Sequence, residues 1–180
     1  MPRHKAFVGA LLCLAAAANA AVVETGASGF LSTHEVTVSA SPADAYKALV
    51  AEVGRWWNPA HTYSGDAANL SIDARPGGCF CERLPNGGGV QHLSVAYTSP
   101  GQVLRLTGAL GPLQGSGLAG SMTWKFTPGP VATRIELSYS VGGYLHGGFQ
   151  KMAPAVDFVV GEQLNRLRTF IETGKPEAPK

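Results

Sequence analysis

Apolar and polar residues alternate along most of this chain, which is the pattern of strands with one buried face. Short turns rich in Gly, Pro and Asn separate the later segments, so neighbouring strands are predicted to pair in an antiparallel fashion. The alternating segments are residues 33–40, 69–74, 79–84, 90–97, 103–109, 120–127 and 133–141.

Two other segments repeat apolar residues every three or four positions, as amphipathic helices do. The first begins at Ser41, a good N-cap, and Pro42, a residue type favoured at the first helical position, and we expect it to end at Gly54. The proline-interrupted residues 55–67 follow it as a connection. The second helix is predicted over residues 154–173 and is ended by the glycine that comes next.

The order of these elements predicts an α+β fold. An antiparallel sheet with one apolar face needs a cover. Only the C-terminal helix, about 30 Å long for twenty residues, is long enough to provide it. We therefore expect a curved antiparallel sheet of about seven strands wrapped around that helix, with short helices between the first and second strands.

The first twenty residues do not fit this pattern. They begin with the basic Arg3 and Lys5, continue with an apolar run over residues 6–18, and end in the Ala-Asn-Ala of residues 18–20. This is the arrangement of a secretory signal peptide, and the run is shorter than the roughly 20 residues that span a bilayer. We expect cleavage after residue 20, no stable membrane anchor afterwards, and a periplasmic or secreted protein.

The composition fits one globular domain. Apolar residues make up 45% of the chain and charged residues 14%, so it can bury a core and is not disordered. Cleavage removes two of the 14 basic residues and leaves as many as the 12 acidic ones, so nothing favours binding to nucleic acid. We expect a flexible leader over residues 21–32, one domain over residues 33–174 and a C-terminal tail over residues 175–180.

Three short motifs resemble the SRPBCC superfamily, whose members share the START-like helix-grip fold. They are Ser41-Pro42, Trp56-Trp57, and Gly77-Gly78 with Phe80 and Glu82. The chain looks most similar to the branch of the heat-shock-protein ATPase activator C-terminal domain, and its later segments resemble an uncharacterised exported bacterial subgroup. The resemblance implies a cavity between sheet and helix. Because the superfamily includes lipid carriers, cyclases, hormone receptors and co-chaperones, it indicates the fold more than the function.

Cys79 and Cys81 lie two positions apart on a predicted strand and therefore point the same way. A zinc site would need two more ligands, and no close pair of histidines supplies them, so we predict no metal and no cofactor. A disulfide between the two would be strained, because extended residues at this spacing lie near the limit of about 7 Å for bridged Cα atoms. We expect ordinary strand cysteines, with a redox pair as the alternative.

Glu82 shares a strand face with the apolar Phe80 and Leu84, so we expect its carboxylate to point inward. It then either acts on a ligand, as an anchor or as an acid or base, or forms a structural ion pair. His92, on the next strand, offers a group that titrates near neutral pH, although the pattern does not decide which face of that strand is buried. Glu82 and His92 are the candidate catalytic residues.

Aromatic and aliphatic side chains supply the other candidate ligand contacts, although those on strands pack the core equally well. The glycine-rich residues 108–120 are either a lid over the cavity mouth or an ordinary long loop, and residues 142–149 are a candidate opposite lip. The candidate ligand-binding residues are Trp56, Trp57, Tyr63, Phe80, Glu82, His92, Leu110, Leu113, Met122, Trp124, Tyr139 and Val156.

The leading hypothesis is an exported protein that holds a small apolar or amphipathic molecule between sheet and helix. One alternative is a cyclase- or dehydratase-like enzyme in which Glu82 and a nearby His or Tyr move protons on a bound ketone. A second alternative is a partner-binding exported protein that uses residues 108–120. Because no nucleophile motif occurs, we favour binding over catalysis, and we expect a monomer or weak dimer with no nucleic-acid partner.

Overall fold

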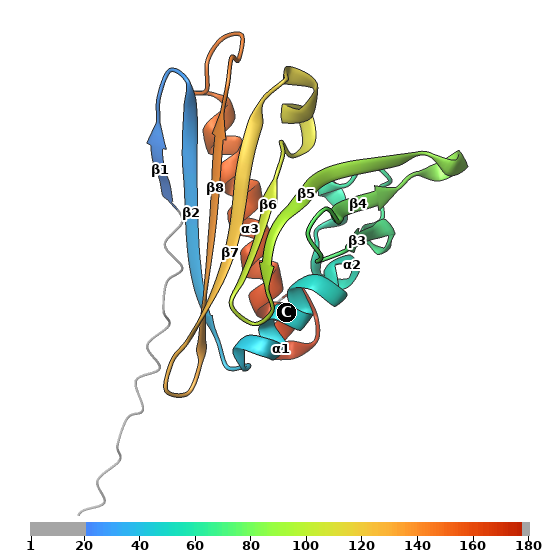
Figure 1. Ribbon diagram of the computed structural model, residues 1–180, viewed down its shortest axis with the longest axis vertical. Helices are drawn as coiled ribbons and strands as arrows, with labels where there is room; N and C mark the ends of the chain where they lie inside the picture. Colours follow the sequence, from blue (N-terminus) through green and yellow to red (C-terminus); the bar gives the residue numbers. More distant parts are fainter. Residues whose placement is uncertain (1–20, 178–180) are drawn as a thin grey trace, which may run out of the picture.

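The computed structural model describes residues 21–177, which form one antiparallel sheet of eight strands with helices packed against it (Figure 1). The predicted signal peptide lies outside the described residues. The strands lie in the order β1-β2-β8-β7-β6-β5-β4-β3, so β2 and β8 are the one adjacent pair in this sheet that is not consecutive in the chain. Their bounds are β1 (Ala21–Thr25), β2 (Gly29–Val38), β3 (Leu70–Ile72), β4 (Cys79–Arg83), β5 (Gly89–Ser99), β6 (Val103–Thr107), β7 (Ala119–Pro128) and β8 (Thr133–Gly142).

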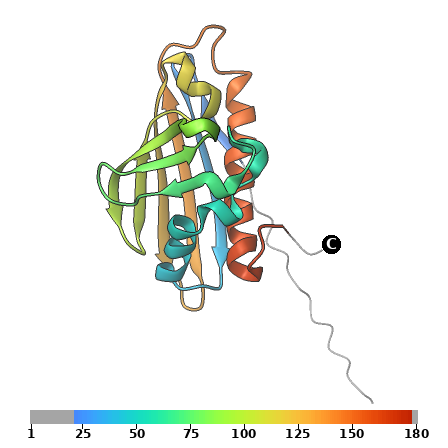
Figure 2. The same ribbon diagram turned by 90° about the vertical axis from the view of Figure 1, so that its right-hand side faces the viewer.

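One long helix, α3 (Met152–Thr173), runs alongside the sheet and covers its apolar face (Figure 2). Two shorter helices, α1 (Pro42–Ala51) and α2 (Val53–Trp56), connect β2 to β3. Gly54 therefore lies inside α2, whereas we expected it to end the first helix. The predicted α+β helix-grip fold is confirmed. Within residues 21–177, no helix is long and apolar enough to cross a membrane.

The segment that we expected to be a flexible leader is part of the sheet. Residues 21–25 form β1, which pairs with β2 from Ala21 opposite Thr33 to Thr25 opposite Phe30. The sheet therefore has eight strands where the sequence predicted about seven. Backbone hydrogen bonds hold an edge strand whatever its side chains are, and the sequence Ala-Val-Val-Glu-Thr of β1 does not alternate between apolar and polar residues.

Two bulges in β5 bend the sheet. Each inserts one residue that has no direct partner, His92 opposite β4 and Ala96 opposite β6. An extra residue in one strand of an antiparallel pair bends that strand and increases its twist. As a result β5, β4 and β3 turn away from the plane of β2, β8 and β7 (Figure 1).

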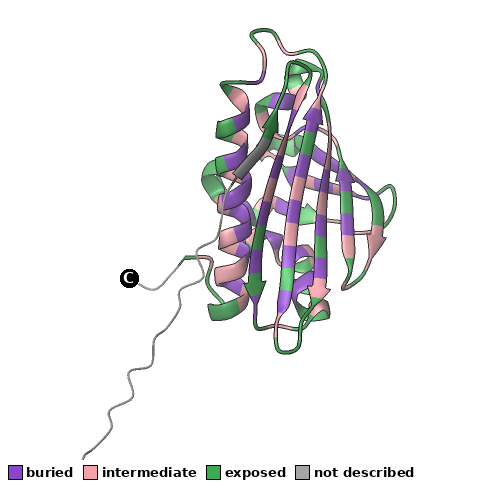
Figure 3. Ribbon diagram, turned by 90° about the vertical axis from the view of Figure 1, so that its left-hand side faces the viewer, coloured by how far each residue is buried: buried purple, intermediate pink, exposed green. Residues whose placement is uncertain are grey.

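Burial alternates residue by residue along the long strands (Figure 3). In β8, Ile135, Leu137 and Tyr139 are buried. Arg134, their neighbour in the chain, is exposed on the opposite face and pairs with Glu35 at 3.0 Å. One face of the sheet is thus apolar and the other polar, as the alternation predicts.

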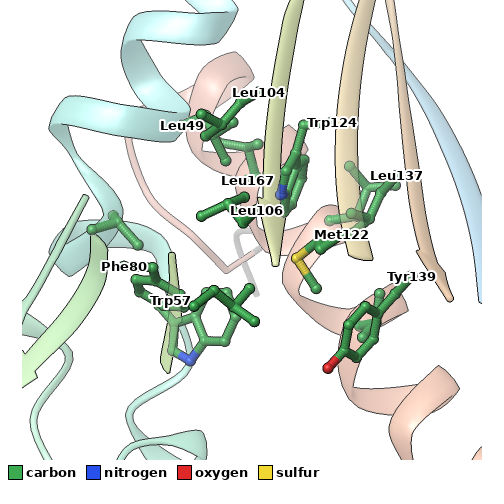
Figure 4. Packing of buried hydrophobic residues seen from close by; sticks show 14 of the residues in the cluster. Leu49, Trp57, Phe80, Leu104, Leu106, Met122, Trp124, Leu137, Tyr139 and Leu167 are labelled. Carbon is green, nitrogen blue, oxygen red and sulfur yellow. The ribbon is translucent and has the colours of Figure 1, made fainter. Parts of the chain in front are cut away.

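Side chains fill the space between the sheet and the C-terminal half of α3 (Figure 4). Leu49 of α1, Leu104 of β6 and Leu167 of α3 are each at most 1% exposed and lie together. The rings of Trp56 and Trp124 pack edge to face, with centroids 6.3 Å apart. We call these five residues the packed end of the interface.

Cys79 and Cys81 form a disulfide, so the prediction of ordinary strand cysteines was wrong. That prediction assumed a fully extended strand. Here the two Cα atoms are 5.4 Å apart, which is within the usual range for a bridge. The bulge at His92 lies opposite this point of β4, so the shortened strand and the irregular pairing occur together.

Candidate functional site

A cavity of about 480 Å³ lies between the N-terminal half of α3, the segment after α2 and the loop after β6. Small-molecule sites typically occupy about 300–1,000 Å³, so the cavity has room for such a ligand. Its lining residues are Trp57, Ala60, His61, Thr62, Tyr63, His92, Leu110, Gly111, Pro112, Met152, Ala155, Val156, Val159 and Val160.

The helix supplies most of the apolar wall. Val156, Val159 and Val160 recur at a spacing of three and four, which places them on one side of α3. Met152 and Ala155 extend the same wall by one turn toward the start of the helix. The core-facing apolar stripe of α3 therefore continues beyond the packed part of the core. There it forms one wall of the cavity.

The loop after β6 supplies the opposite wall and is held in place by a buried tyrosine. The Tyr139 hydroxyl accepts the backbone N–H of Leu110 at 2.9 Å and lies 3.2 Å from the carbonyl oxygen of Gly108, to which it donates. Burial raises the pKa of Tyr139 to about 12, so its hydroxyl stays protonated and can donate.

The remainder of this glycine-rich loop is folded against the protein. Residues 111–116 form a short 3-10 helix, and Leu113 and Leu118 are buried. The side-chain amide of Gln114 donates to the backbone carbonyl of Gln91 at 2.9 Å. Leu113 and Leu118 thus point into the core, whereas the half-buried Leu110 lines the cavity.

His92 is the most buried polar residue in the cavity lining. The bulge in β5 turns both His92 and Leu93 inward, where they are 6% and 1% exposed. This explains why the alternating pattern did not show which face of the strand is buried. Nε2 of His92 lies 2.9 Å from a carboxylate oxygen of Glu82.

Glu82 lies behind His92, outside the cavity lining, and is 2% exposed. Its carboxylate accepts the backbone N–H of Tyr63 at 3.1 Å and that of Ser64. Burial by itself would raise the pKa of Glu82, but the hydrogen bonds from Ser64, Tyr63 and His92 outweigh burial and lower the pKa. Glu82 is therefore ionised at neutral pH and acts as an acceptor.

Burial lowers the pKa of His92, and the hydrogen bond and charge of Glu82 offset only part of that effect. The ring is therefore neutral at neutral pH and carries one N–H. Because an ionised carboxylate can only accept, Nε2 carries that hydrogen and donates it to Glu82. Nδ1 has no hydrogen-bond partner among residues 21–177, and its lone pair remains available to a ligand.

A second carboxylate fixes the cavity wall formed by residues 58–63. Glu162 of α3 accepts the side-chain amide of Asn58 at 2.6 Å and lies 3.0 Å from Nε2 of His61. The backbone N–H of Asn58 also donates to Gln163 of the same helix at 2.9 Å. The segment is thus held from α3 at one end and by Glu82 of β4 at the other.

The structure brings part of the predicted set to the cavity. The cavity is lined by Trp57, Tyr63, His92, Leu110 and Val156. Two predicted residues lie directly behind that lining: Phe80, whose ring centroid is 4.9 Å from that of His92, and Glu82. The others lie in the core outside the lining, and are Trp56, Leu113, Met122, Trp124 and Tyr139.

Several lining residues were missed by sequence reasoning. Val159 and Val160 belong to the apolar stripe identified in the C-terminal helix, so the stripe itself was the available signal. His61 and Glu162 are 101 residues apart in the chain, and nothing in the sequence connects them. Their contact depends on how α3 lies across the segment after α2.

A second depression, of about 620 Å³, lies beside the start of α1. Proline residues contribute much of its wall, and its one ionisable lining residue, Lys125, lies 3.5 Å from the carboxylate of Glu136. It contains no buried acid or base. The cavity at His92 is therefore the candidate functional site.

The sequence matches no family model and no curated protein. Among solved structures, the conserved protein of unknown function EF2215 from Enterococcus faecalis superposes with a TM-score of 0.61 at 16% identity, over 90% of this chain and 80% of that one. CalU16 from Micromonospora echinospora gives 0.60 at 15% identity, over 90% and 88% of the two chains. The Aha1 dimer from Colwellia psychrerythraea gives 0.56 at 20% identity, over 79% and 96%. At these identities the likeness shows the helix-grip fold alone.

Proposed function

We propose that this protein binds a small, largely apolar molecule in the cavity between α3 and the bent sheet. The observation that carries the proposal is a cavity with mostly apolar walls and one buried, oriented imidazole, that of His92. Burying about 200 Å² of apolar ligand surface would supply about 5 kcal/mol before the costs of association.

The polar groups of the cavity favour a ligand that carries a hydrogen-bond donor. His92 offers the lone pair of Nδ1, which pairs with a hydroxyl or N–H group. The other lining histidine, His61, already pairs with Glu162. Because no unpaired cation is among the lining residues, a neutral ligand fits the cavity better than an anionic one.

We also propose that the protein carries out this binding outside the cytoplasm. The support is the basic start, the apolar run and the small-residue cleavage pattern of residues 1–20. A carrier in that compartment would shield an apolar molecule from water.

The test uses the neutral fluorescent probe N-phenylnaphthylamine together with native mass spectrometry of protein from an exporting host. Val156→Phe places a larger side chain in the cavity and reduces the space for a ligand, and Val131→Phe, at a site that is 89% exposed, is the matched control. We expect probe binding or a retained ligand mass in the unmodified chain and in Val131→Phe, and at least tenfold weaker binding in Val156→Phe. Equal binding by all three proteins, or none by any of them, would contradict the proposal.

The hydrogen bond between Glu82 and His92 also supports a second function, proton transfer on a bound ketone in a cyclase- or dehydratase-like reaction. His92 would take a proton at Nδ1, and Glu82 would orient the ring and stabilise its cationic form. In this arrangement His92, which touches the cavity, is the base and Glu82 acts through it.

Turnover distinguishes the two functions. An enzyme would dehydrate or cyclise a hydroxyketone or polyketone substrate at a rate that falls at least 100-fold in His92→Gln. A carrier would bind the same compounds unchanged.

A further inference from the structure

The disulfide between Cys79 and Cys81 lies on the opposite face of β4 from the buried Phe80 and Glu82, and both cysteines are half-buried. A bond that closes so short a loop restricts the unfolded chain far less than one that closes a long loop. It therefore contributes little to global stability compared with other disulfides, and its effect must be sought in the local geometry of β4.

The disulfide spans the point where β4 and β5 are paired irregularly. Two residues of a regular strand advance by about 6.6 Å, whereas the Cα atoms of Cys79 and Cys81 are 5.4 Å apart. Cys79 lies opposite Ser94 and Cys81 lies opposite Gln91. Three residues of the shortened β4 thus face four residues of β5, and the extra residue is His92.

This extra residue decides where the imidazole points. Phe80 lies opposite Leu93, so regular pairing would continue with Cys81 opposite His92. Residues directly opposite each other have their side chains on the same face, and His92 would then lie with the cysteines on the outer face. The bulge instead leaves His92 buried and in contact with Glu82.

We propose that the Cys79–Cys81 disulfide positions His92: by holding β4 short, it maintains the bulge in β5 and with it the contact between His92 and Glu82. Reduction by a dithiol breaks the S–S bond, gives both cysteines an S–H, and converts the reductant to its own disulfide. β4 can then extend, β5 can take up regular pairing, and His92 leaves the cavity. The consequence for ligand affinity rests on the proposed function, whereas the movement of His92 does not.

The experiment compares the oxidised chain with the same chain in dithiothreitol, with Cys13→Ser in every sample so that no other thiol takes part. The readout is the pH titration of the His92 ring protons by NMR, assigned with His92→Gln. We expect a pKa below the ordinary histidine value in the oxidised protein, a return toward the ordinary value on reduction, and recovery after reoxidation. Affinity for N-phenylnaphthylamine should fall at least fivefold on reduction.

The double variant Cys79→Ser, Cys81→Ser is the control. It should titrate like the reduced protein and should not respond to dithiothreitol. An unchanged His92 titration in reduced, folded protein would overturn the proposal, and so would loss of the far-ultraviolet circular dichroism signal on reduction, because the proposed effect is local. If the probe binds neither form, the proposed ligand binding fails, while the His92 titration still decides the positioning role.

Discussion

The two ends of the interface between α3 and the sheet differ in what holds them together. At the packed end, Leu49, Leu104 and Leu167 meet and exclude water, and the burial of apolar surface is sufficient to hold the elements. At the other end the helix presents an equally apolar stripe, yet the sheet has turned away and a cavity remains. We call this the hollow end, defined by Tyr63, His92, Leu110, Val156 and Val159.

Hydrogen bonds hold the segments of the hollow end in place, whereas apolar side-chain contacts hold the packed end together. Glu82 and Glu162 hold the segment after α2, and Tyr139 holds the loop after β6. The residues that line the cavity lack van der Waals contacts on the side that faces the cavity. Hydrogen bonds must therefore hold the segments that carry them in place. The comparison shows that the candidate site of this protein is formed by polar anchors that lie behind an apolar lining.

The largest expected difference between the two ends comes from truncating the same residue type in each. Leu167→Ala removes a side chain that is fully buried in the packed end, and should lower the free energy of unfolding by about 2–5 kcal/mol. Leu110→Ala removes a half-buried side chain that already faces the cavity, and should cost less than about 1 kcal/mol. Urea denaturation of the ligand-free proteins measures both, and equal costs would show that the cavity is filled.

Replacing a valine by the larger phenylalanine tests the same difference between a tightly packed region and the hollow end. Val53 of α2 is 2% exposed, and a Cβ added to its neighbour Gly54 would lie 2.9 Å from a backbone oxygen, so the region has no spare room. Val53→Phe should therefore destabilise by about 1–3 kcal/mol. Val156→Phe, which extends into the cavity, should change the free energy of unfolding by less than about 0.5 kcal/mol. Thermal unfolding of the two variants provides the measurement, and a strongly destabilised Val156→Phe would count against an empty hollow end.

The smallest expected effect is the dependence of stability on pH that comes from His92 at the hollow end. The folded state lowers the pKa of His92, so below its ordinary value of about 6.5 the unfolded chain binds more protons than the folded one. Stability is then full above about pH 6.5 and falls as the pH drops from there, with a slope of at most about 1.4 kcal/mol per pH unit. The contribution of Glu82, whose pKa is also lowered, is lost only at more acidic pH, below its ordinary value of about 4.3.

Unfolding free energies measured from pH 8 to pH 5 test this dependence. His92→Gln should remove the His92 part of the slope, and His146→Gln, at an exposed site, should leave the slope unchanged. An identical slope in the unmodified chain and in His92→Gln would show that His92 is not buried as a neutral ring.

Local patterns in the sequence predicted most of the fold because they act over a few residues. Ser41 caps α1 by accepting the N–H of Asp44 at 3.2 Å, as the residue types indicate. Gly174 ends α3 in a left-handed conformation with φ of 75°, which glycine adopts without strain. β1 was missed because an edge strand is held by its backbone, and side-chain alternation does not report on it.

The candidate site was only partly predictable, because its contacts join distant parts of the chain. The inward direction of Glu82 follows from the face that it shares with Phe80, and both are buried. The orientation of His92 depends on a bulge, which breaks the alternation on which strand prediction relies. The disulfide occurs at the same irregularity, and it was not predicted because regular extension would have kept the cysteines farther apart.

The sequence by itself determined every strand except β1, the long amphipathic helix and the packing of that helix on the sheet, because alternation, capping and helical spacing are local and are repeated many times along the chain. Only the tertiary structure decided where the interface is filled and where it is hollow. That choice depends on the curvature of the sheet and on hydrogen bonds between residues as distant as His61 and Glu162. A single bulge at His92 changes which side chains meet, while the composition and the spacing of residues stay the same.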